Sequence, residues 1–404
     1  MSRSRKRAPQ PRVGALQPEP RHAGPLNVDN LLADRKVRII VCCGSGGVGK
    51  TTTSAALALR AAEQGRKVVV LTIDPARRLA QSMGIEALDN SPRPVQGIND
   101  AAGGELEAMM LDMKRTFDEV VQSQASPEKA QQILDNPFYI AVSSSFAGTQ
   151  EYMAMEKLGQ LDKDAQKSGR WDLIVVDTPP SRSALDFLDA PERLSSFLDG
   201  RFMRLLLAPA KGPARLMTAG FGMVTRALTT IIGAQVLQDM SAFVSAFDTL
   251  FGGFRARAQR TFELLQADGT AFLVIAAPER DAMREAAYFV DRLSQEDMPL
   301  AGLVINRTSD LAEADTAPLS ANTAMAAYEK LHQPGADSYE KLAGGLLRLH
   351  ADKMQAVTRE HDLIDRFATA HPDVPRAKIR ALATDVHDLD GLRQVGALLA
   401  DQPE

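Results

Sequence analysis

The sequence contains few of the residues that build metal and redox sites. Its 404 residues include two cysteines, one tryptophan and six histidines. Cys42 and Cys43 are adjacent in a predicted strand, where successive side chains point to opposite faces and do not ordinarily form a disulfide. No C-x-x-C pair occurs and the histidines lack ligand spacing, which argues against a structural zinc ion. So few thiols are typical of a reducing cytoplasm.

The sequence also lacks a strong excess of charge and a long apolar run. Its net charge is −4 at pH 7 and its isoelectric point is about 6.0, which argues against nucleic acid as a partner. The charge-free run 227–238 is too short to cross a membrane. We therefore expect a cytoplasmic protein that is not itself transmembrane and whose contact with a membrane, if any, is peripheral.

The chain divides into a tail and a body. Residues 1–35 are rich in proline and arginine and show no apolar periodicity, so we predict a disordered basic N-terminal tail. The tail lacks the apolar run of a secretory signal peptide, and a contact with nucleic acid or acidic lipid is the alternative to a solvated tail. Residues 36–404 are predicted to form one enlarged α/β domain.

A glycine-rich stretch fills every fixed position of the phosphate-binding loop G-x-x-x-x-G-K-[ST]. Consecutive backbone N–H groups must curl around a phosphate there, and glycines permit that close approach. Lys50 is expected to reach the β- and γ-phosphates of ATP, and the Thr51 hydroxyl to bind Mg²⁺. A predicted strand at 37–43 precedes the loop and a predicted helix at 51–64 follows it. The predicted nucleotide-binding residues are Gly44, Ser45, Gly46, Gly47, Val48, Gly49, Lys50, Thr51 and Thr52.

Short apolar runs alternate with helical stretches along the body. This alternation predicts the fold of a P-loop nucleotide hydrolase: a mainly parallel sheet flanked by helices, with ligands at the carboxyl ends of the strands. A long amphipathic helix at 338–369 and a last helix at 389–399 are also predicted. The apolar stripe of the long helix consists of Leu342, Leu346, Leu349, Met354, Val357, Ile364 and Phe367. The further predicted strands are 67–73, 107–111, 173–177, 271–277, 300–306 and 379–384.

Two aspartates follow predicted strands at the ligand-binding edge. Asp177 ends an apolar run at the position from which an aspartate can hold the Mg²⁺ shell. Asp74 ends another, where it could orient the attacking water as a catalytic residue beside Lys50. The alternative for Asp74 is a helix N-cap, with Pro75 at the first helical position.

These motifs resemble those of the arsenite-pump ATPase and tail-anchored-protein targeting ATPase family, within the group that includes the Min- and Par-type partitioning ATPases. The resemblance implies ATP hydrolysis, a contact of Asn306 with adenine, and a dimer that closes on ATP and opens on hydrolysis. The matching stretches are Gly44 to Thr52, Asp74-Pro75-Ala76 for the first switch, Asp177-Thr178-Pro179-Pro180 for the second, Ala277-Pro278-Glu279-Arg280 and Val304-Ile305-Asn306-Arg307.

The sequence departs from the family pattern at several places. Ser45 stands where the family has a lysine that reaches the partner's nucleotide, and Ser181-Arg182-Ser183 replaces the usual Thr-Gly-His of the second switch. The cysteine pair that bridges dimers in eukaryotic members is missing, as is a cysteine cluster that could bind arsenite. We therefore predict slow hydrolysis by a homodimer, and an active heterodimer with a paralogous ATPase, unless Arg77, Arg78 or Arg182 supplies the missing charge.

One segment carries unusually little charge for a surface. Between Leu216 and Phe247 only Arg226 and Asp239 are charged, and we predict an apolar helical subdomain, residues 195–260, inserted in the ATPase domain. Its apolar stripe could pack into its own core. Alternatively it could form a groove for a hydrophobic client helix or a membrane protein, lined by adaptable side chains such as Met217, Met223 and Met240.

Three functions remain open from the sequence. The first is an ATPase whose cycle binds and releases an apolar protein segment or a membrane partner. The second is the motor subunit of an arsenite-type anion pump. The third is a regulatory ATPase of the partitioning or positioning type.

Overall fold

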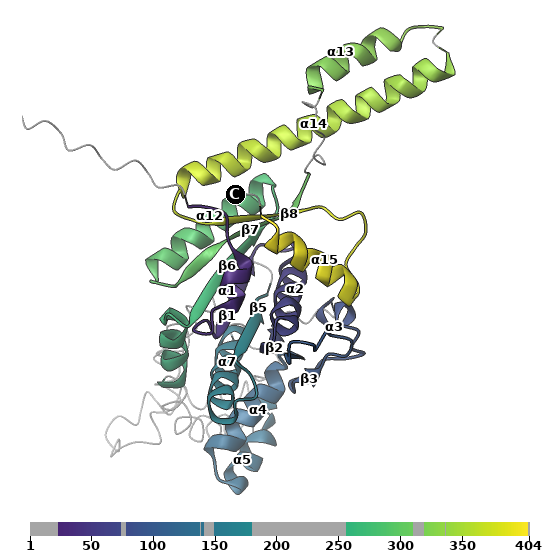
Figure 1. Cartoon of the computed structure of the whole chain (residues 1–404). Helices are drawn as coiled ribbons and strands as arrows, with labels where there is room; N and C mark the ends of the chain where they lie inside the picture. Colours follow the sequence, from purple (N-terminus) through teal and green to yellow (C-terminus); the bar gives the residue numbers. More distant parts are fainter. Residues whose placement is uncertain are drawn as a thin grey trace, which may run out of the picture.

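The chain folds around one mixed sheet of eight strands in the order β3-β4-β2-β5-β1-β6-β7-β8 (Figure 1). The computed structural model describes residues 23–73, 78–137, 139–140, 149–179, 256–309, 319–335 and 337–402. All strand pairs are parallel except β3 with β4. The strands are β1 Ile39–Gly44, β2 Lys67–Thr72, β3 Arg93–Pro94, β4 Glu105–Met110, β5 Leu173–Asp177, β6 Thr270–Ala276, β7 Leu300–Thr308 and β8 Arg376–Arg380. The predicted α/β fold class is confirmed.

Helices cover both faces of the sheet, which leaves an apolar core on each side (Figure 1). One core contains residues of α2 and α15, and the other contains residues of α4, α7 and α12. Cys42 belongs to the first core and Cys43 to the second, as expected for neighbours in a strand. The helices are α1 Val28–Ala33, α2 Lys50–Glu63, α3 Arg78–Ser82, α4 Met113–Gln124, α5 Pro127–Leu134, α7 Thr149–Ser168, α12 Arg280–Gln295, α13 Ala321–Leu331, α14 Ser338–Ala370 and α15 Leu389–Ala400.

The predicted strands match the sheet closely at its centre and less well at its edges. The run 173–177 is β5 residue for residue, and β1, β2, β6 and β7 differ from their predictions by one or two residues at an end. At the edges, β8 begins at Arg376, three residues before its predicted start, and the two-residue β3 was not predicted. Both edge strands carry charged residues, which weakens the apolar signal on which the prediction depended.

The predicted tail is too long. Residues 23–35 belong to the body, where α1 buries Val28 and Leu32 and Pro25 pairs with Arg376 of β8. The segment is held by Arg66, whose buried guanidinium donates to the carbonyl oxygens of Leu32 at 3.1 Å and Asp34 at 3.3 Å. The prediction of disorder is therefore wrong for residues 23–35.

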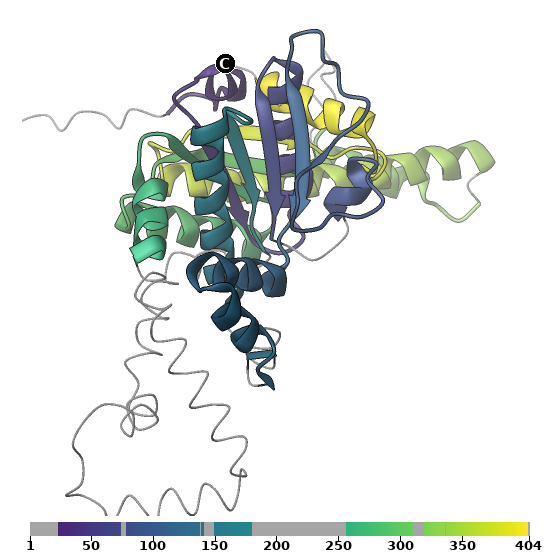
Figure 2. The same cartoon turned by 90° about the horizontal axis from the view of Figure 1, so that it is seen from below.

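The helices α13 and α14 pack against each other and extend away from the sheet (Figure 2). The C-terminal half of α14 lies on the body and buries Val357, Ile364 and Phe367, as predicted. Leu342, Leu346 and Leu349 of the same predicted stripe are 64%, 60% and 67% exposed. The N-terminal half contacts α13 through another face, with Gly344 and Ala351 buried.

Most of the predicted apolar subdomain, with Met217, Met223 and Met240, lies outside the described residues. Of the range 195–260, the structure describes only the start of a helix at 256–266. Within the described parts of the chain, no helix combines the length and apolarity that crossing a membrane would need.

Candidate functional site

Asp177 is brought to the phosphate-binding loop by the order of the strands. β5 lies between β1 and β2, and Asp177 is paired with Cys42 on one side and Thr72 on the other. The carboxylate is buried, and its Oδ2 accepts hydrogen bonds from Thr51 Oγ1 at 2.8 Å and Thr72 Oγ1 at 2.9 Å. The two residues predicted to hold the metal, Thr51 and Asp177, are therefore in direct contact.

The chemistry of these two side chains fits Mg²⁺. A hydroxyl and a carboxylate are hard oxygen donors, and Mg²⁺ in nucleotide sites takes one or two protein oxygens and completes its shell with water and phosphate. Where the chain is described, no cluster of three or more histidine, cysteine or acidic residues could hold a metal ion. The donors suit a magnesium ion delivered with its nucleotide, since no cage built by the protein alone is present there.

Lys50 and the helix it begins face the loop. Helix α2 starts at Lys50, and Gly49 caps it without a side-chain hydrogen bond, so its first N–H groups can bind an anion. The Lys50 side chain is buried, and its Nζ donates to the carbonyl oxygen of Ser45 at 2.8 Å. The ammonium thus crosses the loop from its end to its beginning, and a phosphate bound in the loop would be within its reach.

Gly44 and Gly49 lie so close to neighbouring atoms that a Cβ at either position would clash. A Cβ on Gly44 would lie 2.1 Å from the carbonyl oxygen of Ile275 in β6. Gly49 has a φ of +93°, and a Cβ there would lie 2.2 Å from Nδ2 of Asn306. The loop is therefore pressed against the ends of neighbouring strands, and side chains are excluded from both positions.

Asn306 and Arg307, at the end of β7, contact the loop. Asn306 Nδ2 donates to the carbonyl oxygen of Val48 at 2.8 Å, and Arg307 Nη1 donates to that of Gly47 at 3.1 Å. The adenine contact of Asn306 stays a prediction; its amide keeps one N–H that could serve a base. Sequence reasoning named Asn306 for this site and missed Arg307, whose only signal was its place directly after that asparagine.

β2 ends at Thr72, and the chain is described as far as Ile73, one residue before Asp74. Ile73 N donates to the carbonyl oxygen of Asp177 at 2.9 Å, so the end of β2 is fixed beside this aspartate. Asp74, Arg77 and Arg182 lie outside the described residues. The catalytic role of Asp74 and any compensating cation among these arginines remain predictions.

The two cysteines are unsuited to bind a metalloid. Both are fully buried, and burial raises the pKa of Cys42 and of Cys43 to about 12. The thiols therefore stay protonated at neutral pH, and the thiolate is the form that binds metals.

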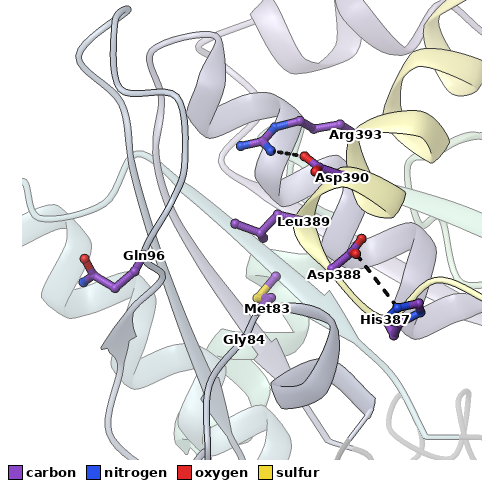
Figure 3. Close-up of a pocket in the computed structure, with 8 residues that line it drawn as sticks. All are labelled: Met83, Gly84, Gln96, His387, Asp388, Leu389, Asp390 and Arg393. Atoms are coloured by element: carbon purple, nitrogen blue, oxygen red, sulfur yellow. Dashed lines mark hydrogen bonds and ion pairs between the residues drawn. The ribbon is translucent and has the colours of Figure 1, made fainter.

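A pocket lies apart from the loop, between the end of α3, Gln96 and the start of α15 (Figure 3). Its charged side chains have partners within the chain: Arg393 pairs with Asp390 at 2.6 Å, and Asp388 accepts from the N–H of Gly391 at 2.8 Å. None of the predicted site residues lines it.

The sequence matches the family described as anion-transporting ATPase over residues 37–332. ATPase BagA of Mycobacterium tuberculosis is 23% identical over 379 residues, which is 91% of this chain and 93% of that protein. ATPase GET3 of Malassezia globosa is 29% identical over 176 residues, 44% of this chain and 49% of that protein. The arsenical pump-driving ATPase of Acidiphilium multivorum is 31% identical over 158 residues, 39% of this chain and 26% of that protein.

The crowding at Gly49 can be tested against Gly47. Both glycines have a positive φ, but a Cβ on Gly47 would meet open space. We expect Gly47→Ala to lower the free energy of unfolding of the nucleotide-free protein by about 1 kcal/mol, the cost of the backbone conformation alone. Gly49→Ala should cost about 1 kcal/mol more, because Asn306 must move and give up its hydrogen bond to the Val48 carbonyl oxygen. Denaturant unfolding measures both, and equal losses would show that Asn306 does not restrict Gly49.

Proposed function

The chain belongs to the anion-transporting ATPase family, and we propose that it is a cytoplasmic ATPase whose nucleotide cycle binds and releases an apolar protein segment or a membrane partner. The family match and the relatives named as ATPases confirm the resemblance to this family and the hydrolysis of ATP. The client, the dimer and the location are the parts that we add.

The observation that carries the proposal is the contact of Thr51 with Asp177 at the mouth of the loop. A phosphate-binding loop alone indicates a nucleotide. The loop threonine and a buried aspartate on a neighbouring strand add two oxygen donors at one point, 2.8 Å apart. This pair supports a nucleotide site that uses Mg²⁺, as ATP hydrolysis requires.

Each side chain of the site has a separate task. When ATP binds, we expect the Lys50 ammonium to leave the Ser45 carbonyl oxygen and neutralise charge on the β- and γ-phosphates. Mg²⁺ held by Thr51 and Asp177 would neutralise the charge that develops on the phosphate oxygens. Asp74 is proposed to orient the attacking water.

The proposed client site rests on composition. The segment between Leu216 and Phe247 contains two charged residues, Arg226 and Asp239, and several methionines that can adapt to different apolar partners. It comes after the second switch motif, which begins with Asp177. Binding of an apolar helix by this segment would therefore respond to the state of the nucleotide site.

The proposed dimer must supply a positive charge that Ser45 lacks. A homodimer would bring two serines together, whereas a paralogous ATPase with a lysine at this position would provide the cation to this chain's site. We therefore propose that the faster enzyme is a heterodimer, and that the homodimer is slow.

Two other functions are compatible with the same nucleotide site. One relative is named an arsenical pump-driving ATPase, and an anion-pump motor would share the same nucleotide site. The two buried cysteines, with a pKa of about 12, argue against a metalloid site made of thiolates. A partitioning or positioning ATPase would use the basic residues near the N-terminus to contact nucleic acid or lipid.

Substitution of Lys50 should affect ATP binding, whereas substitution of Asp74 should affect mainly the rate of hydrolysis. Lys50→Ala should abolish tight ATP binding, because the buried cation that faces the phosphates is lost. Asp74→Asn should leave the ATP dissociation constant within about twofold and slow turnover by about 10²-fold, the usual contribution of a water-orienting group. Calorimetric titration and phosphate release measure the two. Turnover of Asp74→Asn at the parent rate would leave Asp74 only a capping role.

The client proposal can be tested with a defined probe, an apolar helical peptide of about 20 residues fused to a soluble carrier. The Asp74→Asn protein loaded with ATP should retain this probe and release it when ADP replaces ATP. Replacement of Met217, Met223 and Met240 by glutamate should abolish retention, while each site changes the free energy of unfolding by no more than about 0.5 kcal/mol. Unfolding of this triple variant would instead show that the methionines form a core.

The role of Ser45 can be tested with one substitution. We expect Ser45→Lys to raise the turnover of the chain alone by at least about tenfold, because the dimer then supplies a cation to each site. Addition of a paralogous subunit should have the same effect on the parent protein. Fast hydrolysis by the parent alone, unchanged in Arg77→Ala, Arg78→Ala and Arg182→Ala, would remove the need for a second cation.

A further inference from the structure

Arg307 lies in an irregularity at the carboxyl end of β7. Asn306 pairs with Ile379 of β8 and Thr308 pairs with Arg380, so that Arg307 is the extra residue of a bulge. Its φ is +63°, and among the described residues other than glycine only Asp297 shares a positive φ. An arginine does not adopt this backbone conformation readily, because its Cβ is crowded there. Strained backbone conformations of this kind are concentrated at functional sites, where the surrounding structure holds them in place.

The bulge directs two neighbouring side chains onto the loop. Arg307 Nη1 donates to the carbonyl oxygen of Gly47 at 3.1 Å, and Asn306 Nδ2 donates to that of Val48 at 2.8 Å. The backbone N–H of Arg307 donates to Asn306 Oδ1 at 2.9 Å, which fixes the end of the amide that faces the loop. Two consecutive carbonyls of the loop are thus held by two consecutive residues of β7.

The contacts of the Gly47 and Val48 carbonyl groups also set the direction of the N–H groups that follow them in the chain. In a trans peptide the carbonyl of one residue and the N–H of the next point in opposite directions, and the described residues contain no cis peptide bond. With the carbonyls of Gly47 and Val48 held toward β7, the N–H groups of Val48 and Gly49 must point away from β7. These are N–H groups of the loop that the sequence assigns to phosphate binding.

We propose that Arg307, supported by Asn306, is a positioning residue that fixes the N–H groups of Val48 and Gly49 in the direction needed to bind the phosphates of the nucleotide. The inference rests on the proposed nucleotide site and adds a residue to it that acts through the loop. A loop fixed before binding loses less conformational freedom when the ligand arrives, so its affinity for phosphate is higher.

The test compares ADP with inorganic pyrophosphate, which has phosphates but no base. Both are titrated against the full chain by competition with a fluorescent ADP analogue. We expect Arg307→Ala to weaken the binding of both ligands by the same factor, about tenfold for one lost hydrogen bond from a charged donor. The ratio should be the same at 50 mM and 500 mM salt, values on either side of the range where screening becomes strong. Arg284→Ala, which removes an exposed arginine from α12, is the control and should bind as the parent does.

The outcomes are distinct. Weaker ADP binding with unchanged pyrophosphate binding would overturn the inference and place Arg307 on the base or ribose. A loss that shrinks at high salt would also overturn it, in favour of a direct charge contact with phosphate. Parent-like affinity of the variant for both ligands would do the same, whereas a parent protein that binds neither ligand would refute the proposed nucleotide site.

The variant Arg307→Gly removes the side chain without straining the backbone, because glycine adopts a positive φ readily. It therefore separates loss of the side chain from loss of folding. We expect its nucleotide-free melting temperature to equal or exceed that of the parent, and its affinity for ADP and pyrophosphate to fall as in Arg307→Ala. A stable Arg307→Gly protein with parent affinity would refute the positioning role.

Discussion

The site depends on the parallel pairing that inserts β5 between β1 and β2. This pairing places Asp177 level with the end of β2 and beside the strand that enters the phosphate-binding loop. A buried carboxylate needs hydrogen-bond donors, and Thr51 and Thr72 supply them from the two neighbouring elements. A shift of β5 by one residue would turn Asp177 to the opposite face of the sheet and separate these groups. The contact between Thr51 and Asp177, on which the proposed metal site rests, is therefore a consequence of strand register.

The side chains of Lys50 and Thr51 already have internal partners without nucleotide. Lys50 bonds the Ser45 carbonyl, and Thr51 bonds Asp177. Nucleotide and Mg²⁺ must replace these contacts, so the net gain from each exchanged hydrogen bond is small. Affinity then depends strongly on how well the loop is fixed beforehand. The crowding of Gly44 and Gly49 and the contacts from Asn306 and Arg307 all restrict the same few peptide units.

Local patterns predicted what depends on neighbours in sequence. The loop spacing singled out Lys50 and Thr51, and the apolar run before Asp177 singled out the aspartate that lies against Thr51, because buried parallel strands read as continuous hydrophobic stretches. The same reasoning failed where burial is set by distant elements. Leu342 lies on an apolar stripe and is exposed, because α13 packs on another face of α14. Arg307 reaches the loop only because of a bulge between β7 and β8, and no local pattern reports a bulge between strands separated by a helical hairpin.

The described residues on either side of the stretch 180–255, which includes the apolar segment, are held by contacts to the body of the protein. The chain leaves the sheet at Thr178, directly after Asp177, and the Thr178 hydroxyl donates to the Cys42 carbonyl oxygen at 2.9 Å. It is described again from residue 256, where Arg257 pairs with the buried Glu156 of α7 at 2.9 Å. A buried ion pair resists displacement, because a lone buried charge is costly. The segment between these points is therefore tied to a firm anchor at one end. At the other end the segment follows shortly after Asp177, so that on the proposed role of this aspartate a change at the nucleotide site would reach the segment from that end.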